Sequence, residues 1–255
     1  MISNSLLEEI KSIAKEAGQA IMDIYENADL SSVVEHKADD SPLTLADQAS
    51  EKVIKRRLET LSENYPILSE EGKKMSFEER KDWHTFWLVD PLDGTKEFIK
   101  RNGQFTVNIA LIKDHYPIAG IIYVPVTDTF YYGNGEEAFK QDSSGVKALK
   151  VNNKAENRIA VRSASHAAPE EETVLEKYDA KDSISVGSSL KFCMVAEGKA
   201  DLYYRHGPTM EWDTGAGQAI LESAGGKVFK GSTEEERFNY NKENLLNGSF
   251  LCLGF

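Results

Sequence analysis

The sequence is poor in cysteine. Its 255 residues include only two, Cys193 and Cys252, and their spacing matches no metal-binding or redox motif. Cys193 lies in an apolar stretch. We therefore expect two buried free thiols in a reducing compartment, and we exclude a disulfide scaffold.

Long apolar runs are also missing. No window approaches the ~18 consecutive apolar residues that a membrane-spanning helix needs. The first 18 residues, "MISNSLLEEIKSIAKEAG", are amphipathic and carry early acids. They predict a structural helix and not a signal peptide.

Positive charge is scarce as well. The chain has 30 Lys and Arg residues and 42 Asp and Glu residues, which gives a formal net charge of −12. Such a chain repels a phosphate backbone, so we expect no nucleic acid polymer as a partner. A small phosphorylated substrate remains compatible if a few cations gather in one pocket, and so does a site in which acids hold metal ions.

The first part of the chain predicts two helices followed by β-structure. Apolar residues recur at helical spacing over 4–26 and from about Thr44 to Leu61. Strands are expected at 66–71 and 85–90, with a charged loop at 72–84 between them. A hairpin is expected at 105–112 and 117–126, and a further strand at 129–133.

The second part predicts an alternation of helices and strands. The polar, Gly/Ser-bearing stretch 140–157 marks a soft boundary near 155, which divides the chain into an N-terminal lobe (1–155) and a C-terminal lobe (156–255). We expect strands at 158–162, 183–187, 200–204 and 227–229, and helices from Pro169, at 189–198 and at 213–226.

Acidic residues cluster where apolar segments end. "WLVDPLDGTKEF" places Asp90 and Asp93 after a strand, with Pro91 restricting the backbone and Gly94 permitting an unusual φ. We interpret this stretch as a turn that aims both carboxylates and the Leu92 carbonyl at one point. "SEE" (69–71) and "EWDTGAG" (211–217) supply further acids, and hard divalent cations such as Mg²⁺ prefer oxygen ligands.

Each acid also has an ordinary structural interpretation. Asp90 and Asp93 could form a turn, Glu70 and Glu71 could be solvated, and Asp213 could cap a helix. Three such clusters together favour a shared site, although composition does not establish that they converge.

The motifs taken together resemble a known family. "DPLDGTKEF" and "WDTGAG", with "SEE" and "SPLTLAD" before them, resemble the inositol monophosphatase superfamily over nearly the whole chain. "DGTKEF", "NGQFTVNIALI" and "GSSLKFC" are most similar to its 3′(2′),5′-bisphosphate nucleotidases of the bacterial CysQ type. Inositol monophosphatases typically follow the DGT with Thr-Asn-Phe, where this chain has Lys96-Glu97-Phe98. The fold class implied is α/β (α+β), a layered α/β/α/β/α sandwich of the inositol monophosphatase and fructose-1,6-bisphosphatase type, with the metals where its two lobes meet.

The resemblance also implies a metal site. Glu70, Asp90 and the Leu92 carbonyl would hold one Mg²⁺, and Asp90, Asp93 and Asp213 a second. A third, weaker Mg²⁺ near Glu70 is common in the family. Glu70 and Thr95 would orient the attacking water, with Asp47 behind the Thr95 hydroxyl.

The same resemblance implies a nucleotide site. Gly94 and Thr95 would receive the transferring phosphate at the start of a helix. Ser188 and Lys191, on one side of a helix start, would hold the uncleaved phosphate together with His166 and Arg205. Each of these residues alone also fits an ordinary surface or capping role. The substrate-binding set is Asp93, Gly94, Thr95, His166, Ser188, Lys191, Arg205 and Asp213.

The function implied is a Mg²⁺-dependent, lithium-sensitive phosphatase that converts adenosine 3′,5′-bisphosphate to AMP. 3′-Phosphoadenylyl sulfate is a second candidate substrate, which would connect the enzyme to sulfate assimilation. Alternatives are an inositol phosphate or sugar bisphosphate phosphatase of the same superfamily, a haloacid dehalogenase-type phosphatase with an aspartyl nucleophile, and a non-enzymatic metal or nucleotide sensor. The resemblance also implies a cytoplasmic location. It leaves open whether the protein is a monomer or a homodimer, and whether it contacts the cytoplasmic side of the inner membrane.

Overall fold

A seven-stranded sheet forms the larger of two main β-layers in the computed structural model, which describes residues 2–27, 34–36, 42–163 and 169–255. Its strand order is β3-β4-β5-β6-β7-β8-β9, with β3 and β4 parallel and the other neighbours antiparallel. The strands are β3 Ile67–Ser69, β4 Thr85–Asp93, β5 Thr106–Lys113, β6 Tyr116–Val124, β7 Thr129–Gly133, β8 Ala138–Asp142 and β9 Gly145–Leu149.

The second layer is a five-stranded sheet of order β11-β10-β12-β16-β14. Its strands are β10 Arg158–Ser163, β11 Ala180–Val186, β12 Leu202–Arg205, β14 Lys227–Lys230 and β16 Phe250–Leu253. Two short pairs complete the β-structure: β1 Val34–His36 with β2 Pro42–Thr44, and β13 Thr209–Met210 with β15 Leu246–Asn247.

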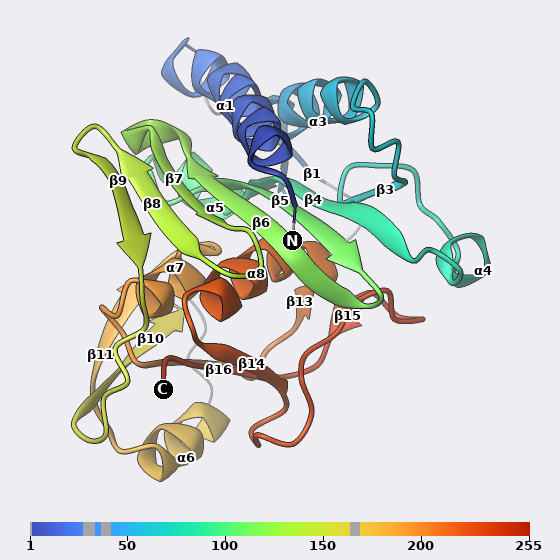
Figure 1. Cartoon of the computed structure of the whole chain (residues 1–255). Coiled ribbons are helices and arrows are strands. Elements are labelled where there is room, and N and C mark those ends of the chain that lie inside the picture. The colour runs from blue at the N-terminus through green and yellow to red at the C-terminus, as the bar shows by residue number, and fades with distance from the viewer. Residues whose placement is uncertain (1, 28–33, 37–41, 164–168) are drawn as a thin grey trace.

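Helices separate and cover these sheets (Figure 1). Helices α1 (Asn4–Asn27) and α3 (Leu45–Leu58) cover the outer face of the larger sheet, α7 (Leu190–Ala196) and α8 (Gly215–Ser223) lie between the sheets, and α6 (Pro169–Lys177) lies on the far side of the smaller one. The predicted α/β/α/β/α layering is confirmed. Short helical segments are α4 Phe77–Arg80, α5 Thr95–Ile99, η1 Pro125–Thr127 and η2 Glu211–Asp213.

Strand β4 shows how the sequence builds these layers. Its side chains alternate between the two faces of the sheet: Trp87 and Val89 join the core under α1 and α3, whereas Phe86 and Leu88 join the core shared with α7 and α8. Both faces are covered by helices, so the strand reads as a continuous apolar run. None of the helices in the described ranges combines the length and apolar content that crossing a bilayer requires.

Small residues allow α8 to lie close to the larger sheet. A Cβ atom added at Gly120 of β6 would come within 2.5 Å of the Ala216 carbonyl oxygen, and one at Gly133 of β7 within 2.7 Å of Ser223 Oγ. Because α8 follows Asp213 directly, this contact also sets where that carboxylate lies.

Several expectations about single elements were wrong. The loop expected at 72–84 contains α4, and the polar stretch 140–157 forms most of the β8–β9 hairpin, since its alternating polar residues lie on a half-exposed edge. The helix expected to open at Asp213 begins at Gly215, after η2. Strand β16 was not expected. The division into lobes near 155 stays a prediction; α8, from the C-terminal part, packs on the N-terminal sheet.

The α8 contact predicts an effect on stability. Gly120→Ala should lower the free energy of unfolding by about 1–3 kcal/mol, because the methyl group must displace helix backbone. Gly248→Ala is a matched control, since a Cβ at Gly248 would meet nothing within 4 Å, and it should stay within about 0.5 kcal/mol of wild type. Urea unfolding measures both. Equal stability of the two variants would show that α8 does not depend on this close approach.

Candidate functional site

Asp90 and Asp93 lie on either side of a β-bulge. Asp90 is paired with Asn108 of β5, and Asp93 is paired with Thr106. Strand β4 therefore advances by three residues over a stretch in which β5 advances by two. In a regular strand, side chains three apart point to opposite faces; one extra residue returns them to the same face. The prediction of a turn here is therefore wrong, because the chain stays extended through Asp93. The two carboxylates nevertheless point to the same face of the strand. Gly94 follows with φ 96°, as expected.

Helix α3 and strand β3 approach the same bulge. Ser50 Oγ of α3 donates to the Pro91 carbonyl oxygen over 2.7 Å in a buried position. Asp47, one turn earlier on α3, is 4% exposed. Glu70 follows β3, and its backbone N–H donates to the Val89 carbonyl oxygen of β4. The ends of three elements thus meet beside Asp90.

The Asp90 carboxyl is surrounded by acids. It is fully buried, and burial raises its pKa well above the usual range. The next largest contributions come from Glu70, Asp93, Asp213 and Asp47, in that order, and each raises the pKa further. Acids from four separate stretches of chain therefore lie near enough to affect the Asp90 carboxyl.

Asp213 reaches this point from the C-terminal part of the chain. It ends η2, and its Oδ2 accepts a hydrogen bond from the Met210 backbone N–H over 2.8 Å. Burial and then Asp93 raise its pKa well above the usual range. The fully buried Glu211 accepts from the backbone N–H groups of Asn241 and Lys242 and from Lys242 Nζ, which holds η2 in place.

The donor set suits hard divalent cations. Hydrogen bonds engage Oδ1 of Asp90, Oδ2 of Asp93 and Oδ2 of Asp213, so each carboxylate retains a second oxygen. Buried carboxylates that repel one another are stabilised when a cation is shared between them. In the described ranges, however, no three His, Cys, Asp or Glu side chains already have metal-ligand spacing, so the structure shows a carboxylate cluster and not a formed coordination shell.

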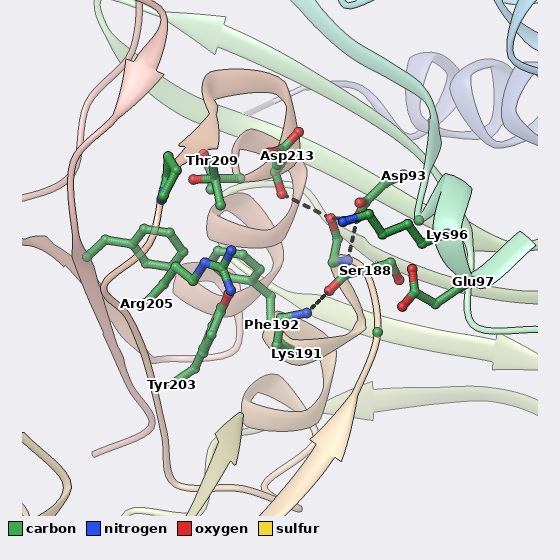
Figure 2. Close-up of a pocket in the computed structure, with 16 residues that line it drawn as sticks. Asp93, Lys96, Glu97, Ser188, Lys191, Phe192, Tyr203, Arg205, Thr209 and Asp213 are labelled. Atoms are coloured by element: carbon green, nitrogen blue, oxygen red, sulfur yellow. Dashed lines mark hydrogen bonds between the residues drawn. The ribbon is translucent and has the colours of Figure 1, made fainter. Parts of the chain in front are cut away.

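A cavity of about 210 Å³ opens next to the cluster (Figure 2). One water needs only about 10–15 Å³ on the same measure, so the cavity can hold a substantial ligand group. Figure 2 shows Asp93 and Asp213 on one side and Lys191, Tyr203 and Arg205 on the other. The lining residues are Asp93, Gly94, Lys96, Glu97, Gly187, Ser188, Ser189, Lys191, Phe192, Tyr203, Arg205, Pro208, Thr209, Asp213, Thr214 and Phe250.

Ser188 and Lys191 form a braced turn at this cavity. Ser188 has φ 47° and lies before the N-cap Ser189 of α7, so it does not share one side of the helix start with Lys191 as expected. Lys191 is 8% exposed, and its Nζ donates to the carbonyl oxygens of Ser188 (2.6 Å) and Val186 (3.3 Å). The Ser188 hydroxyl oxygen is buried without a hydrogen-bond partner among the described residues, which a ligand in the cavity could supply.

Burial changes the charge state of Lys191. Desolvation lowers the pKa of its ammonium group to about 8, against the opposing effect of Asp93. The group therefore remains mainly charged at pH 7. Arg205 lies beside it, half-buried, with Nε donating to the Gly207 carbonyl oxygen over 3.2 Å.

The structure brings together most of the residues predicted for the site. Asp93, Gly94, Ser188, Lys191, Arg205 and Asp213 line the cavity, whereas Asp47, Glu70, Asp90 and Leu92 do not. Thr95 begins α5 directly after Gly94. His166 lies outside the described residues.

Other lining residues were missed by sequence reasoning. Lys96 points into the cavity in Figure 2; the sequence signalled it only as a departure from the inositol monophosphatase motif. Ser189 and Tyr203 also line the cavity, and Asn108 contacts Asp93 from behind. Tyr203 was interpreted as a packing residue, since most aromatic side chains in strands are, and a lone serine or strand asparagine does not indicate such a position.

Comparison with known proteins fits this geometry. The model of the inositol monophosphatase family matches residues 3–251. The chain belongs to the inositol monophosphatase family. The resemblance stated from the motifs is confirmed, as is the prediction of an enzyme from a phosphatase family, whose members depend on metal ions.

Near relatives within the family are nucleotidases. The chain is 45% identical to the 3′(2′),5′-bisphosphate nucleotidase CysQ of Salmonella typhimurium over 248 residues, 96% of this chain and 98% of the relative. It is 44% identical to CysQ of Escherichia coli K12 over 246 residues, with the same coverage.

Solved structures agree. CysQ from Bacteroides thetaiotaomicron superposes with a TM-score of 0.84 at 42% identity, covering 97% of both chains. The inositol monophosphatase of Thermotoga maritima superposes with a TM-score of 0.77 at 20% identity, covering 98% of this chain and 92% of the other. The second likeness shows the fold alone.

The acidic cluster predicts an unusual dependence of stability on pH. Because folding raises the pKa of Asp90, this group favours the folded state below the unfolded pKa of about 4 and loses that contribution as the pH rises through the folded value. In EDTA, Asp90→Asn should therefore be more stable than wild type at pH 8, by roughly 2–4 °C in Tm for about 1 kcal/mol, with the gain disappearing near pH 4.

Asp182→Asn is the control for this measurement. Asp182 also accepts a hydrogen bond from a neighbouring backbone N–H, that of Ser183, over 2.7 Å, but Asp182 is exposed. The Tm of Asp182→Asn should therefore equal that of the wild-type protein at each pH. A Tm of Asp90→Asn below that of wild type at pH 8 would contradict the account of mutual repulsion.

Proposed function

We propose that this protein is a Mg²⁺-dependent phosphatase that hydrolyses the 3′-phosphate of adenosine 3′,5′-bisphosphate to give AMP. The observation that carries the proposal is the position of a buried carboxylate cluster at one side of a cavity with Lys191 and Arg205 at the other. A bisphosphate presents two anionic groups, and this arrangement offers each a different partner. The nucleotidase names of the near relatives support the same substrate class.

The carboxylates are the proposed metal ligands. Glu70, Asp90 and the Leu92 carbonyl would hold one Mg²⁺, and Asp90, Asp93 and Asp213 a second, with a third near Glu70 as a further position. When bound, the cations would lower the pKa of a coordinated water and stabilise the negative charge on the phosphoryl oxygens.

The chain's own groups position the reactants. Glu70 and Thr95 orient the attacking water, and Asp47, behind the Thr95 hydroxyl, is the base that takes up the proton. The rigidity of β4 and the buried anchor from Ser50 to Pro91 keep Asp90 in place, which matters because a displacement of about 1 Å can cost 100-fold in rate.

We assign the uncleaved 5′-phosphate to the side of the cavity that carries Lys191 and Arg205. A lysine ammonium has three donors; two of those of Lys191 are used by the Ser188 and Val186 carbonyls, which leaves the third for the phosphate. Arg205 offers a guanidinium suited to two phosphate oxygens. Ser188 donates its hydroxyl, Lys96 adds charge at the cavity edge, and His166 keeps its predicted role as a phosphate contact.

Further features follow from the same assignment. 3′-Phosphoadenylyl sulfate is a second substrate, which places the enzyme in sulfate assimilation, and Li⁺ inhibits by taking a Mg²⁺ position. The protein acts in the cytoplasm, as a monomer or homodimer, and any contact with the membrane is peripheral.

A phosphate-release assay tests the proposal. With Mg²⁺, adenosine 3′,5′-bisphosphate should be hydrolysed at least tenfold faster than inositol 1-phosphate or fructose 1,6-bisphosphate, and EDTA should abolish the reaction. Asp93→Asn should lower kcat by several orders of magnitude, while Asp182→Asn keeps full activity. Equal turnover of inositol 1-phosphate would overturn the substrate, and a phospho-aspartate trapped with hydroxylamine would overturn direct attack by water.

The lowered pKa of Lys191 predicts a pH effect on substrate binding. Its ammonium loses the proton as the pH rises through about 8, so kcat/KM for the bisphosphate should fall above pH 8, mainly through KM. In Lys191→Gln, kcat/KM should already be lower at pH 7 by about 10-fold, or 1.4 kcal/mol, and should lack that fall. An unchanged fall above pH 8 in Lys191→Gln would assign it to another group.

A further inference from the structure

Asn108, Ser189 and Thr106 form a buried polar cluster around one oxygen of Asp93, and none of the three has a role in the function proposed above. Three donors converge on Asp93 Oδ2: the Ser189 backbone N–H and the Ser189 hydroxyl, both at 2.5 Å, and Asn108 Nδ2 at 3.4 Å. Asn108 Nδ2 also donates to Ser189 Oγ over 2.8 Å. Asn108 is 1% and Ser189 3% exposed, so these bonds form away from bulk water and are sensitive to the loss of any member.

The direction of the Asn108 amide is determined by a fourth residue. The hydroxyl of Thr106, which is fully buried, donates to Asn108 Oδ1 over 3.0 Å. This bond keeps the carbonyl side of the amide away from Asp93 and presents the NH₂ side to it. An amide turned the other way would place an oxygen against a carboxylate.

Ser189 also joins the two halves of the acidic cluster. Its Oγ lies 2.5 Å from Asp93 Oδ2 and 3.0 Å from the Asp213 carbonyl oxygen. Asp93 belongs to β4 and Asp213 to η2, 120 residues later along the chain, whereas Ser189 precedes α7. The hydroxyl has one hydrogen and so donates to one of these two oxygens at a time, but it lies within contact distance of both carboxylate-bearing segments.

We propose that Asn108 and Ser189 are positioning residues that set the affinity of the site for divalent cations. They occupy Oδ2 of Asp93, which leaves Oδ1 as the oxygen for a cation, and they fix the spacing between Asp93 and Asp213. The inference rests on the proposed function in that it takes Asp93 and Asp213 as cation ligands. Groups that orient metal ligands in this way typically change metal affinity or activity by 10- to 100-fold when removed.

Cation binding and unfolding of the full-length protein test this inference without an activity assay. Mn²⁺ binding is followed by electron paramagnetic resonance and Mg²⁺ binding by calorimetry, and unfolding is measured in EDTA. Asn108→Leu and Ser189→Ala should each raise the Kd for Mn²⁺ by 10- to 100-fold. Asn108→Asp, which keeps the shape but places an oxygen against Asp93, should bind Mn²⁺ no better than Asn108→Leu.

Ser223→Ala is the matched control. Ser223 is also a buried serine with two hydrogen bonds, to the Ala219 carbonyl oxygen and from the Gly135 N–H, but it lies far along α8 from Asp213. It should lose stability in EDTA to a similar extent as Ser189→Ala and keep the wild-type Kd within about twofold. Ser189→Thr, which retains the hydroxyl, should restore most of the affinity.

The outcomes separate the inference from the function. Wild-type Kd values in Asn108→Leu and Ser189→Ala, with only a loss of stability, would overturn it, as would a wild-type protein that binds neither cation. Weakened binding in these variants supports it even if the wild-type protein releases no phosphate from adenosine 3′,5′-bisphosphate, a result that would overturn the proposed function alone.

Discussion

Mutual repulsion among buried carboxylates is the constraint on which the site depends. Asp90 is fully buried, and its strongest charged neighbours are the acids Glu70, Asp93, Asp213 and Asp47. A fold gains nothing from such an arrangement by itself, because burying like charges costs free energy that packing and hydrogen bonds must offset. In the function we propose, divalent cations offset this repulsion, which would couple the stability of this region to its chemistry.

The fold accommodates this repulsion through rigid supports. The bulge in β4 turns Asp90 and Asp93 to the same face, α3 binds the bulge through Ser50, and Glu211 holds η2 through the 239–247 segment. The close contact between α8 and β6 sets the distance between the two parts of the chain. The basic side chains of Lys191 in α7 and Arg205 in β12 lie across the cavity from the acids. The site therefore keeps negative and positive charge on opposite sides of one small cavity.

The layers and most elements could be predicted from the sequence, because buried strands and amphipathic helices have different periods. The β8–β9 hairpin was missed since an exposed edge strand has no continuous apolar pattern, and β16 since it is short and follows an irregular segment. The acids near Asp90 were named in advance because they belong to the motifs that carry the family resemblance. Ser189 and Asn108 were not, since their role arises only where β5 and the start of α7 meet, a contact between residues 81 positions apart.

The central claim is that the acids around Asp90 meet to bind divalent cations. Anomalous scattering from crystals grown with Mn²⁺ tests it most directly. The account predicts peaks in direct contact with the carboxylates of Asp90, Asp93 and Asp213, and the loss of the peak at Asp213 when that residue is changed to Ala. A well-ordered map with no anomalous peak at these carboxylates would contradict it.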